Sequence, residues 1–413
     1  MCHLQSSHTV TSAPMQVHLH GLSLSLWPRK TPRHIYRPSL PLYAIYPAHR
    51  SKQETRDTTR RRAFSGTHQP LTTSGTPSTD ACDTMIQITR LSEVSGRYKA
   101  LLLDQFGVLH DGRRPYPGAV EAVSAAADSG LRLLIISNSS RRSGGTLDKL
   151  AAMGFDRRCF EGVVTSGELT HRFLTLRPDD WWLGVGSRCL HINWSRRGPV
   201  SLEDIGLQAV ADPRDADFFL AHGTEALSLP GGGVEERSLE DLKALLRGAA
   251  EAAVRAGTTP PPLVVANPDV VTVDGDDLVA MPGALAAAYS SAGGPVVLMG
   301  KPSPLIYAAC GEILGLNPSE MLAVGDSLEH DVAGALAAGV DSLFIAGGIH
   351  AQELLVQREG GGESVGVQQP STQKRVDVEA LQRLVSNLHP AVLSAGAARG
   401  VKAPTYVASQ LVW

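Results

Sequence analysis

Short apolar segments alternate with amphipathic segments along most of the chain. The first two apolar segments, residues 100–103 and 131–136, are almost continuously hydrophobic, which is typical of strands buried on both faces of a parallel sheet. Residues 117–129 and 141–153 carry apolar positions at helical spacing, and a further short strand is predicted at 162–164. The pattern predicts an α/β fold, with helices covering both faces of a doubly wound parallel sheet.

A second α/β unit interrupts this alternation and begins near Trp181. It contains apolar segments at 218–221 and 263–266, with a long helix rich in Ala and Leu at 238–256 between them. The first pattern then resumes. The elements predicted there are strands at 296–299, 321–324 and 342–346, and helices that begin at Ser303 and span 329–338.

The predicted organisation is therefore one discontinuous core with an inserted cap. The core comprises residues 85–178 and 295–413, and the α/β cap comprises residues 179–294. The segment 357–374 is rich in Gly, Gln and Ser, so we expect a flexible surface loop without a catalytic role.

The N-terminal segment 1–84 differs from the rest in charge. Residues 1–79 contain ten Lys or Arg and two acidic residues, whereas the whole chain has a formal net charge of -3. An Arg-rich, Ser-rich, acid-poor N-terminus is typical of an organellar transit peptide, and residues 61–65 resemble a mitochondrial processing site. A disordered basic tail is the other interpretation. We expect a cytoplasmic protein, or a mitochondrial or chloroplast one if the segment is a transit peptide.

Composition narrows the set of partners. A net charge of -3 and a pI near 6.5 provide no basic field for nucleic acid, and no apolar run approaches the roughly 20 residues of a membrane-spanning helix. The five cysteines show no metal-ligand spacing. Trp181, Trp182 and Trp194 in the predicted cap suit either its core or the interface of a homo-oligomer, and the sequence leaves both open.

Polar residues follow four of the strands assigned to the core. The carboxyl ends of parallel strands meet at one edge of a sheet, so these side chains would converge there. Carboxylates suit Mg²⁺, a hydroxyl with backbone N–H groups suits a phosphoryl oxygen, and an ammonium neutralises phosphate charge. Each could instead be a helix cap, a turn residue or a surface charge. The residues are Asp104, Ser137, Asn138, Lys301, Asp326 and Asp331.

Four segments around these residues resemble the ordered motifs of a known family. DQFGVLHDG, ISNSS, GKPSP and GDSLEHD resemble the four motifs of the haloacid dehalogenase superfamily of hydrolases. The predicted cap lies between the second and third motifs, as in class IIA members. Ser166-Gly167-Glu168, Asn267-Pro268-Asp269 and Gly283 also resemble that class, and the likeness spans about residues 90–350.

The resemblance implies a Mg²⁺-dependent phosphatase that acts on a small phosphorylated metabolite through an aspartyl-phosphate. The catalytic residues that it implies are Asp104 as nucleophile, Ser137 as donor to a phosphoryl oxygen and Lys301 as charge clamp. The implied metal ligands are Asp104, Asp326, Asp331 and the backbone carbonyl of Phe106. The implied substrate-binding residues are Asn138, Asn267 and Asp269, although Asn267 and Asp269 could also form a simple turn.

Phe106 departs from the family pattern. Typical phosphatases of this family carry an Asp two residues after the nucleophile, which protonates the leaving group and later activates water. Acid–base assistance of this kind contributes about 10²- to 10⁴-fold. Three interpretations follow: a phosphatase in which His110 or Asp111 stands in, a dehalogenase-like or phosphonate-cleaving hydrolase, or a catalytically weak protein that binds phosphate and Mg²⁺.

Overall fold

The computed structural model describes residues 85–274, 277–356, 375–388, 393 and 403–413. The predictions for the N-terminal segment 1–84 and for the loop 357–374 lie outside these residues and stay predictions. Among the helices that the structure describes, none is both long and apolar enough to cross a membrane.

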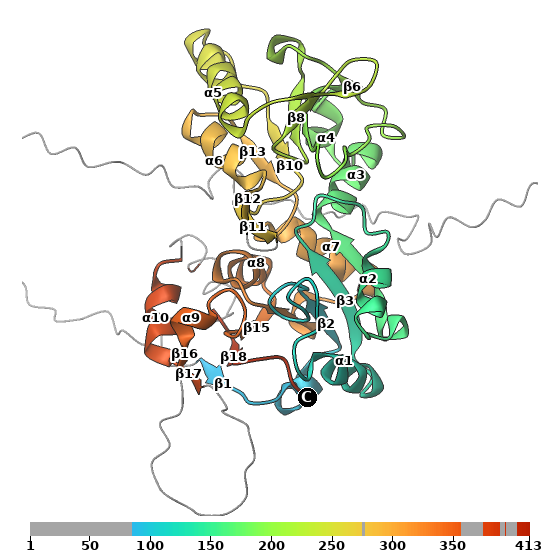
Figure 1. Ribbon diagram of the computed structural model, residues 1–413, viewed down its shortest axis with the longest axis vertical. Coiled ribbons are helices and arrows are strands. Elements are labelled where there is room, and N and C mark those ends of the chain that lie inside the picture. The colour runs from blue at the N-terminus through green and yellow to red at the C-terminus, as the bar shows by residue number, and fades with distance from the viewer. Residues whose placement is uncertain (1–84, 275–276, 357–374, 389–392, 394–402) are drawn as a thin grey trace, which may run out of the picture. The chain divides into compact units, whose positions relative to one another are not determined.

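Seven strands form the first sheet, and every neighbouring pair is parallel (Figure 1). The sheet brings β2 between β14 and β3, although β14 lies more than 200 residues later in the chain. Across the sheet the strands are β1 (Ile86–Gln87), β18 (Tyr406–Ala408), β15 (Asp341–Ile345), β14 (Met321–Gly325), β2 (Ala100–Leu103), β3 (Arg132–Ser137) and β4 (Phe160–Thr165).

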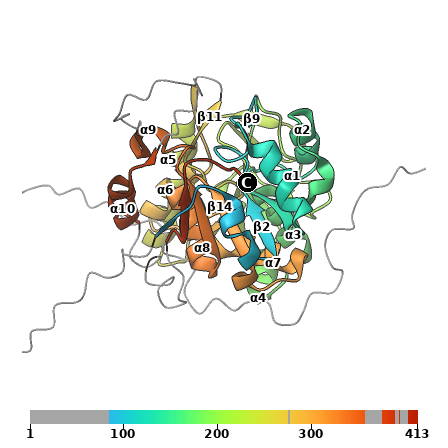
Figure 2. The same cartoon turned by 90° about the horizontal axis from the view of Figure 1, so that it is seen from below.

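Helices cover both faces of this sheet, as predicted. On one face α1 (Ala119–Asp128) packs against Leu101 and Leu103. On the other, α8 (Ala333–Ala338) and α10 (Val378–Ser386) pack with Phe344 and Val407. Figure 2 shows α1 and α10 on opposite sides of β2 and β14. The other helices of this unit are α2 (Thr146–Ala152), α3 (Ser166–Leu176), α7 (Pro304–Leu314) and α9 (Ala351–Leu354), with a π-helical turn at Leu328–Val332.

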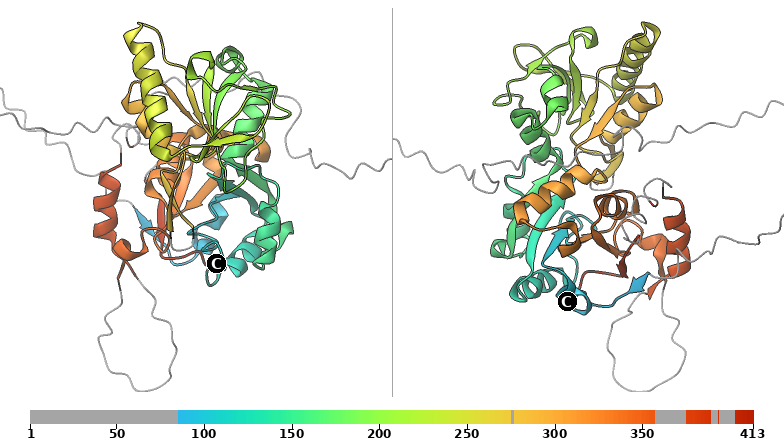
Figure 3. Two further views of the ribbon diagram at one scale, coloured as in Figure 1. Left: turned by 45° about the horizontal axis from the view of Figure 1, so that its top comes forward. Right: turned by 180° about the vertical axis from the view of Figure 1, so that it is seen from behind.

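A second sheet is formed by the inserted segment. Its helices α5 (Leu239–Arg255) and α6 (Gly283–Ser291) bury Leu242, Leu246 and Leu285 against the strands, and Figure 3 shows α5 as the long yellow helix beside them. The strands in order are β13 (Val296–Leu298), β10 (Leu263–Val265), β7 (Phe218–Ala221), β5 (Arg188–Asn193), β8 (Ala226–Ser228) and β9 (Val234–Glu236), with β6 (Gln208–Ala209) beside β5. A separate hairpin joins β11 (Val271–Asp274) to β12 (Asp277–Ala280).

Smaller elements complete the described part. A short α-helix, α4, lies at Asp180–Gly184, and a two-stranded sheet pairs β16 (Leu355–Val356) with β17 (Arg375–Val376). Short 3₁₀ helices lie at Leu91–Glu93, Ser95–Arg97, Arg157–Cys159, Pro213–Asp215 and Pro318–Glu320.

One strand was assigned to the wrong sheet. Residues 296–299 were predicted to return the chain to the core, but β13 pairs with β10 at the edge of the second sheet. A short apolar strand carries no mark of its partner, and its register with Leu263–Val265 decides its place. Lys301 therefore follows a cap strand and reaches the core from there.

The start of the cap also differs in detail from the expectation. The segment around Trp181 is the short helix α4, and the first cap strand, β5, was not predicted because it carries the polar residues His191 and Asn193. Trp182 and Trp194 are buried, which favours the core interpretation for these two. Helix α2 begins only after Gly145, whose φ of 82° is non-helical.

Candidate active site

Asp104 lies at the carboxyl edge of the first sheet, directly after β2. Its backbone N–H donates to the carbonyl of Val324 on the neighbouring strand β14 over 2.9 Å. Because β2 and β14 are parallel and in register at Leu103 and Val324, the residues that follow the two strands, Asp104 and Asp326, come together. Ser137 ends β3 on the other side of β2. Asp104, Ser137 and Asp326 therefore lie at one edge of the sheet, as expected from their positions at the ends of strands.

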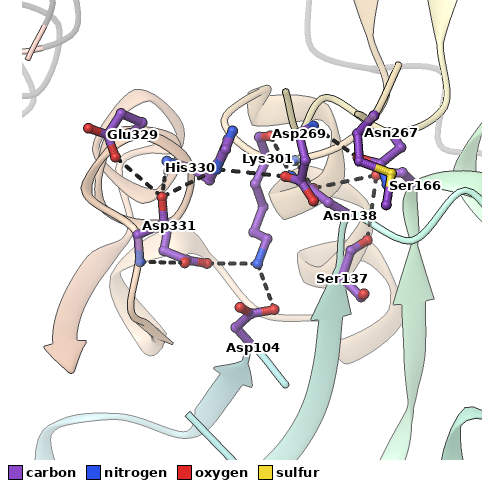
Figure 4. Close-up of polar contacts among 12 residues, drawn as sticks. Asp104, Ser137, Asn138, Ser166, Asn267, Asp269, Lys301, Glu329, His330 and Asp331 are labelled. Carbon is purple, nitrogen blue, oxygen red and sulfur yellow. Dashed lines mark hydrogen bonds and ion pairs between the residues drawn. The ribbon is translucent and has the colours of Figure 1, made fainter. Parts of the chain in front are cut away.

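Lys301 joins two carboxylates of this edge. Its Nζ lies 2.8 Å from Oδ1 of Asp104 and 2.8 Å from Oδ1 of Asp331 (Figure 4). The lysine side chain is only 3% exposed, so both ion pairs are shielded from water. Burial alone would lower the pKa of Lys301, but the charges of Asp104 and Asp331 raise it well above its ordinary value. The ammonium thus remains charged beside the predicted nucleophile.

Three carboxylates form a compact oxygen cluster at the same place. One oxygen from each of Asp104, Asp326 and Asp331 lies within 4.8 Å of the others. The backbone N–H of Ile349 holds Asp326 Oδ2 over 2.8 Å, and the N–H of Ser327 holds Asp331 Oδ2 over 3.1 Å. An all-oxygen donor set with fixed carboxylates fits a hard divalent cation such as Mg²⁺.

Two glycines leave room for this cluster. A Cβ built on Gly107 would lie 1.8 Å from Asp326 Oδ2, and one built on Gly348 would lie 2.1 Å from the same oxygen. Gly107 also has a φ of +78°, a conformation that glycine adopts without strain. The backbone can therefore approach Asp326 closely from both sides.

The electrostatics of the carboxylate cluster favour the binding of a cation. Burial raises the pKa of Asp104 to about 7, although the charge of Lys301 opposes that shift. Burial, together with the charges of Asp104 and Asp331, raises the pKa of Asp326 to about 8. Carboxylates packed this closely repel one another, and a bound cation would relieve the repulsion. The donor set and its charge therefore both fit a metal ion.

The two residues predicted after β3 have different surroundings. The Oγ of Ser137 accepts a long hydrogen bond of 3.3 Å from the backbone N–H of Ser139, and the side chain lies beside the cluster in Figure 4. The side-chain amide of Asn138 is turned toward Lys301 instead. Its Oδ1 accepts from the Lys301 backbone N–H over 2.7 Å, and its Nδ2 donates to the Lys301 carbonyl over 3.0 Å.

The cap loop reaches this site through Asp269. Its Oδ1 accepts from Asn138 Nδ2 over 2.8 Å and lies 3.7 Å from Nδ1 of His330. Asn267 stays within its own loop: its Oδ1 accepts from the N–H of Asp269 over 2.9 Å, and its Nδ2 lies 3.9 Å from the sulfur of Met281. The structure thus brings Asp269 to the core residues and gives Asn267 a turn contact.

Two residues near the cluster were missed by sequence reasoning. His330 lies between Ser327 and Asp269, and Tyr307 donates from its hydroxyl to the carbonyl of Asp331 over 3.0 Å. His330 stands one position before Asp331 in GDSLEHD, so its place in the motif was a usable signal. Tyr307 is an apolar-face residue of α7 by spacing, and nothing in the sequence marks its hydroxyl.

The loop after Asp104 offers no evident proton donor at Phe106 or at the two suggested stand-ins. The Phe106 side chain is 58% exposed, and its ring packs edge-on against His110 at 4.7 Å. His110 is buried, its Nδ1 accepts from the N–H of Gly112, and burial lowers its pKa. Asp111 accepts from the N–H groups of Arg113 and Arg114, which lower its pKa.

Comparisons with known proteins agree with this architecture. A model of the haloacid dehalogenase-like hydrolase family matches residues 101–195, and a model described as HAD-hydrolase-like matches residues 298–365. The interval between the two matches contains most of the second sheet. The matched segments contain most of the first sheet unit, and the first match also includes strand β5 of the second sheet.

Two relatives cover much of this chain, one of them named a phosphatase, and one solved structure shares its fold. Human chronophin is 29% identical over 267 residues, which cover 63% of this chain and 84% of chronophin. An acid sugar phosphatase of Staphylococcus aureus (strain USA300) is 26% identical over 260 residues, 62% of this chain and 90% of its own length. The crystal structure of a haloacid dehalogenase-like hydrolase from Brucella suis 1330 has a TM-score of 0.53 at 24% identity, with 79% of this chain and 100% of that chain covered; this likeness shows the fold. Two family models and two relatives therefore liken this chain to the haloacid dehalogenase-like hydrolases, and a second sheet is inserted between the two matched segments.

Proposed function

We propose that this protein is a Mg²⁺-dependent phosphatase that hydrolyses a small phosphorylated metabolite, with Asp104 as the nucleophile. The observation that carries the proposal is the ion-paired set of Asp104, Lys301 and Asp331, with an oxygen of Asp326 within 4.8 Å of the other two carboxylates. This set combines a nucleophilic carboxylate, a fixed cation and a divalent-metal donor set. The name of the acid sugar phosphatase relative supports a phosphorylated small molecule as substrate.

The first step transfers the phosphoryl group to the protein. A carboxylate oxygen of Asp104 bonds to phosphorus as the bond from phosphorus to the ester oxygen breaks, and the ester oxygen leaves with the electron pair. Lys301 Nζ, 2.8 Å from Asp104 Oδ1, neutralises charge on the phosphoryl oxygens, and Ser137 donates a hydrogen bond to one of them. Water then attacks the aspartyl-phosphate, which releases inorganic phosphate and restores Asp104.

Asp104, Asp326, Asp331 and the backbone carbonyl of Phe106 would hold the Mg²⁺ ion. When bound, the ion supplies positive charge to the phosphoryl group and aligns it for in-line attack. Phosphate and ionised carboxylates together would carry more negative charge than Lys301 alone can balance, which supports the proposal of a second cation at this site.

Because Phe106 stands where a proton donor is expected, we expect the rate of hydrolysis to depend on the leaving group. The same residue is also compatible with a second candidate function. Its side chain cannot give a proton, and the pKa shifts and contacts of His110 and Asp111 do not favour a stand-in. Esters whose leaving group departs without a proton, such as aryl phosphates, should therefore react fastest. The second candidate is a weakly catalytic protein that binds phosphate and Mg²⁺, and this same observation favours it.

One assay separates the two candidates. The full chain is incubated with p-nitrophenyl phosphate with and without Mg²⁺, beside Asp104→Asn and the control Asp128→Asn, an exposed carboxylate at the end of α1. The phosphatase proposal predicts Mg²⁺-dependent turnover that Asp104→Asn abolishes and Asp128→Asn retains. Phosphate binding without turnover supports the weakly catalytic protein, and turnover that survives in Asp104→Asn contradicts the nucleophile.

A further inference from the structure

Asn138 holds both backbone polar groups of the lysine in the site. It accepts from the N–H of Lys301 over 2.7 Å and donates to its carbonyl over 3.0 Å, and the asparagine is only 6% exposed. The paired contacts fix the peptide groups on either side of the Lys301 Cα. Since the ammonium is fixed in turn by Asp104 and Asp331, the whole length of the lysine is restrained.

Gly300 leaves room for the contact between the Asn138 amide and the Lys301 backbone. A Cβ built on Gly300 would lie 2.4 Å from Asn138 Oδ1 and 2.0 Å from Ser166 Oγ, so a larger residue would push the amide off Lys301. Gly300 therefore belongs to the same arrangement. The close approach to Gly300 is made by the Ser166 hydroxyl and by the asparagine amide.

The same amide also touches the cap. Its Nδ2 donates to Oδ1 of Asp269 over 2.8 Å, and Asp269 is fixed within the cap by Asn267, whose Oδ1 holds its N–H, and by the N–H of Gly283, which donates to its carbonyl over 2.9 Å. A continuous set of hydrogen bonds thus runs from the cap loop through Asn138 to Lys301 (Figure 4). Displacement of the cap loop would release one of the four hydrogen bonds that orient the amide; the fourth is a long one of 3.5 Å from Ser166 Oγ to its Oδ1.

We propose that Asn138 is a positioning residue that couples the cap loop to Lys301, and that Asp269 acts as the cap's contact in this coupling. Asn138 then affects phosphate only through the lysine. This assigns Asn138 and Asp269 a role other than the direct substrate binding implied by the family resemblance. The inference rests on the proposed function for the identity of the ligand, a phosphoryl group held by Lys301.

The first test asks whether the effect of Asn138 depends on Lys301. The dissociation constant of inorganic phosphate at saturating Mg²⁺ is measured by calorimetry for the full chain, Asn138→Leu, Lys301→Met and the double variant. We expect Asn138→Leu to weaken phosphate binding about tenfold, or about 1.4 kcal/mol, and to have no further effect, within twofold, once Lys301 is replaced. An equal loss in both backgrounds means that Asn138 binds phosphate directly and overturns the proposal.

The cap offers a matched control in Asn193. This buried asparagine holds another backbone in the same way: its Oδ1 accepts from the N–H of Val200 over 2.9 Å, and its Nδ2 donates to the Val200 carbonyl over 3.0 Å. Asn193→Leu should lower the melting temperature as Asn138→Leu does, with the phosphate dissociation constant unchanged within twofold. A similar loss of phosphate binding in Asn193→Leu would attribute the effect to general destabilisation and overturn the proposal.

A charge exchange tests the cap contact. Asn138→Asp keeps the acceptor for the Lys301 N–H but places a carboxylate against Asp269, so it should weaken phosphate binding about tenfold or more. Adding Asp269→Asn restores a donor between the two side chains and should recover at least threefold of that loss. Losses that multiply instead of recovering overturn the coupling.

Failure of the inference differs from failure of the proposed function. A wild-type chain that binds phosphate but hydrolyses no ester contradicts the phosphatase and leaves both binding tests readable. A wild-type chain that binds no phosphate overturns both.

Discussion

Replacing Lys301 with Met should destabilise the protein far more than loss of a surface charge does. The ammonium is 3% exposed and lies 2.8 Å from a carboxylate on either side, while methionine keeps much of the side-chain volume. Breaking a buried ion pair by removing one partner costs about 3–5 kcal/mol, because the remaining charges stay buried without compensation. In the variant, Asp104 and Asp331 would lose their common cation, and an oxygen of each lies within 4.8 Å of an oxygen of Asp326. We therefore expect the loss of unfolding free energy to lie at the upper end of that range.

Urea unfolding with and without Mg²⁺ checks this expectation. The variant should regain part of its lost stability in Mg²⁺, and Mg²⁺ should raise its unfolding free energy more than that of the wild type, because the cation replaces the missing ammonium. Lys99→Met, which removes an exposed partner of Glu320, serves as the control and should cost less than about 1 kcal/mol. Equal losses in the two variants, or no differential effect of Mg²⁺, would refute the electrostatic account of the cluster.

Three further predictions follow from single contacts. Phe106→Asp should raise the rate on alkyl phosphates relative to p-nitrophenyl phosphate by about 10²-fold or more, since it adds a proton donor; an unchanged ratio of kcat/KM values argues against this role for the position. Gly107→Ala should weaken activation by Mg²⁺, because its Cβ would lie 1.8 Å from Asp326 Oδ2. Gly130→Ala is the control and should leave this activation unchanged, since Gly130 also has a positive φ, +92°, but no atom lies within 4 Å of its built Cβ. Equal effects of the two substitutions would point to backbone strain alone. Burial lowers the pKa of His222 to about 3, so the unfolded chain binds this proton first, and His222 should contribute a loss of stability of about 1.4 kcal/mol per pH unit as the pH falls below 6.5. Burial also lowers the pKa of its neighbour His191, so His222→Gln should make the slope in urea titrations shallower without abolishing it, and a slope equal to the wild type's would count against this role.

Strands with unbroken apolar sequence could be predicted closely from the sequence. The predicted strand at 100–103 coincides with β2, and the apolar segment at 218–221 coincides with β7; both are fully buried. Strand β5 could not be found in this way, because His191 and Asn193 are buried polar residues. Their partners His222 and Ser228 lie more than 30 residues later in the chain. Their hydrogen bonds become visible only once the sheet is formed.

The candidate site likewise contains residues whose positions could be predicted from the sequence and others whose positions could not. Asp104, Ser137 and Asp326 follow neighbouring parallel strands, so topology alone brings them to one edge. Lys301 was predicted for the right site through the wrong strand, because β13 pairs in the second sheet. The orientation of the Asn138 amide depends on the conformation of the Lys301 backbone, which side-chain type and spacing do not encode.

The central claim is that Asp104 carries the phosphoryl group during turnover. The full chain is mixed with p-nitrophenyl phosphate and Mg²⁺, quenched within one turnover and treated with borohydride, which reduces an aspartyl-phosphate to homoserine, and the peptide containing residue 104 is analysed by mass spectrometry. The account predicts homoserine at position 104 and none in chain that has not met substrate. Turnover that leaves Asp104 unmodified, or homoserine at another aspartate, would contradict it.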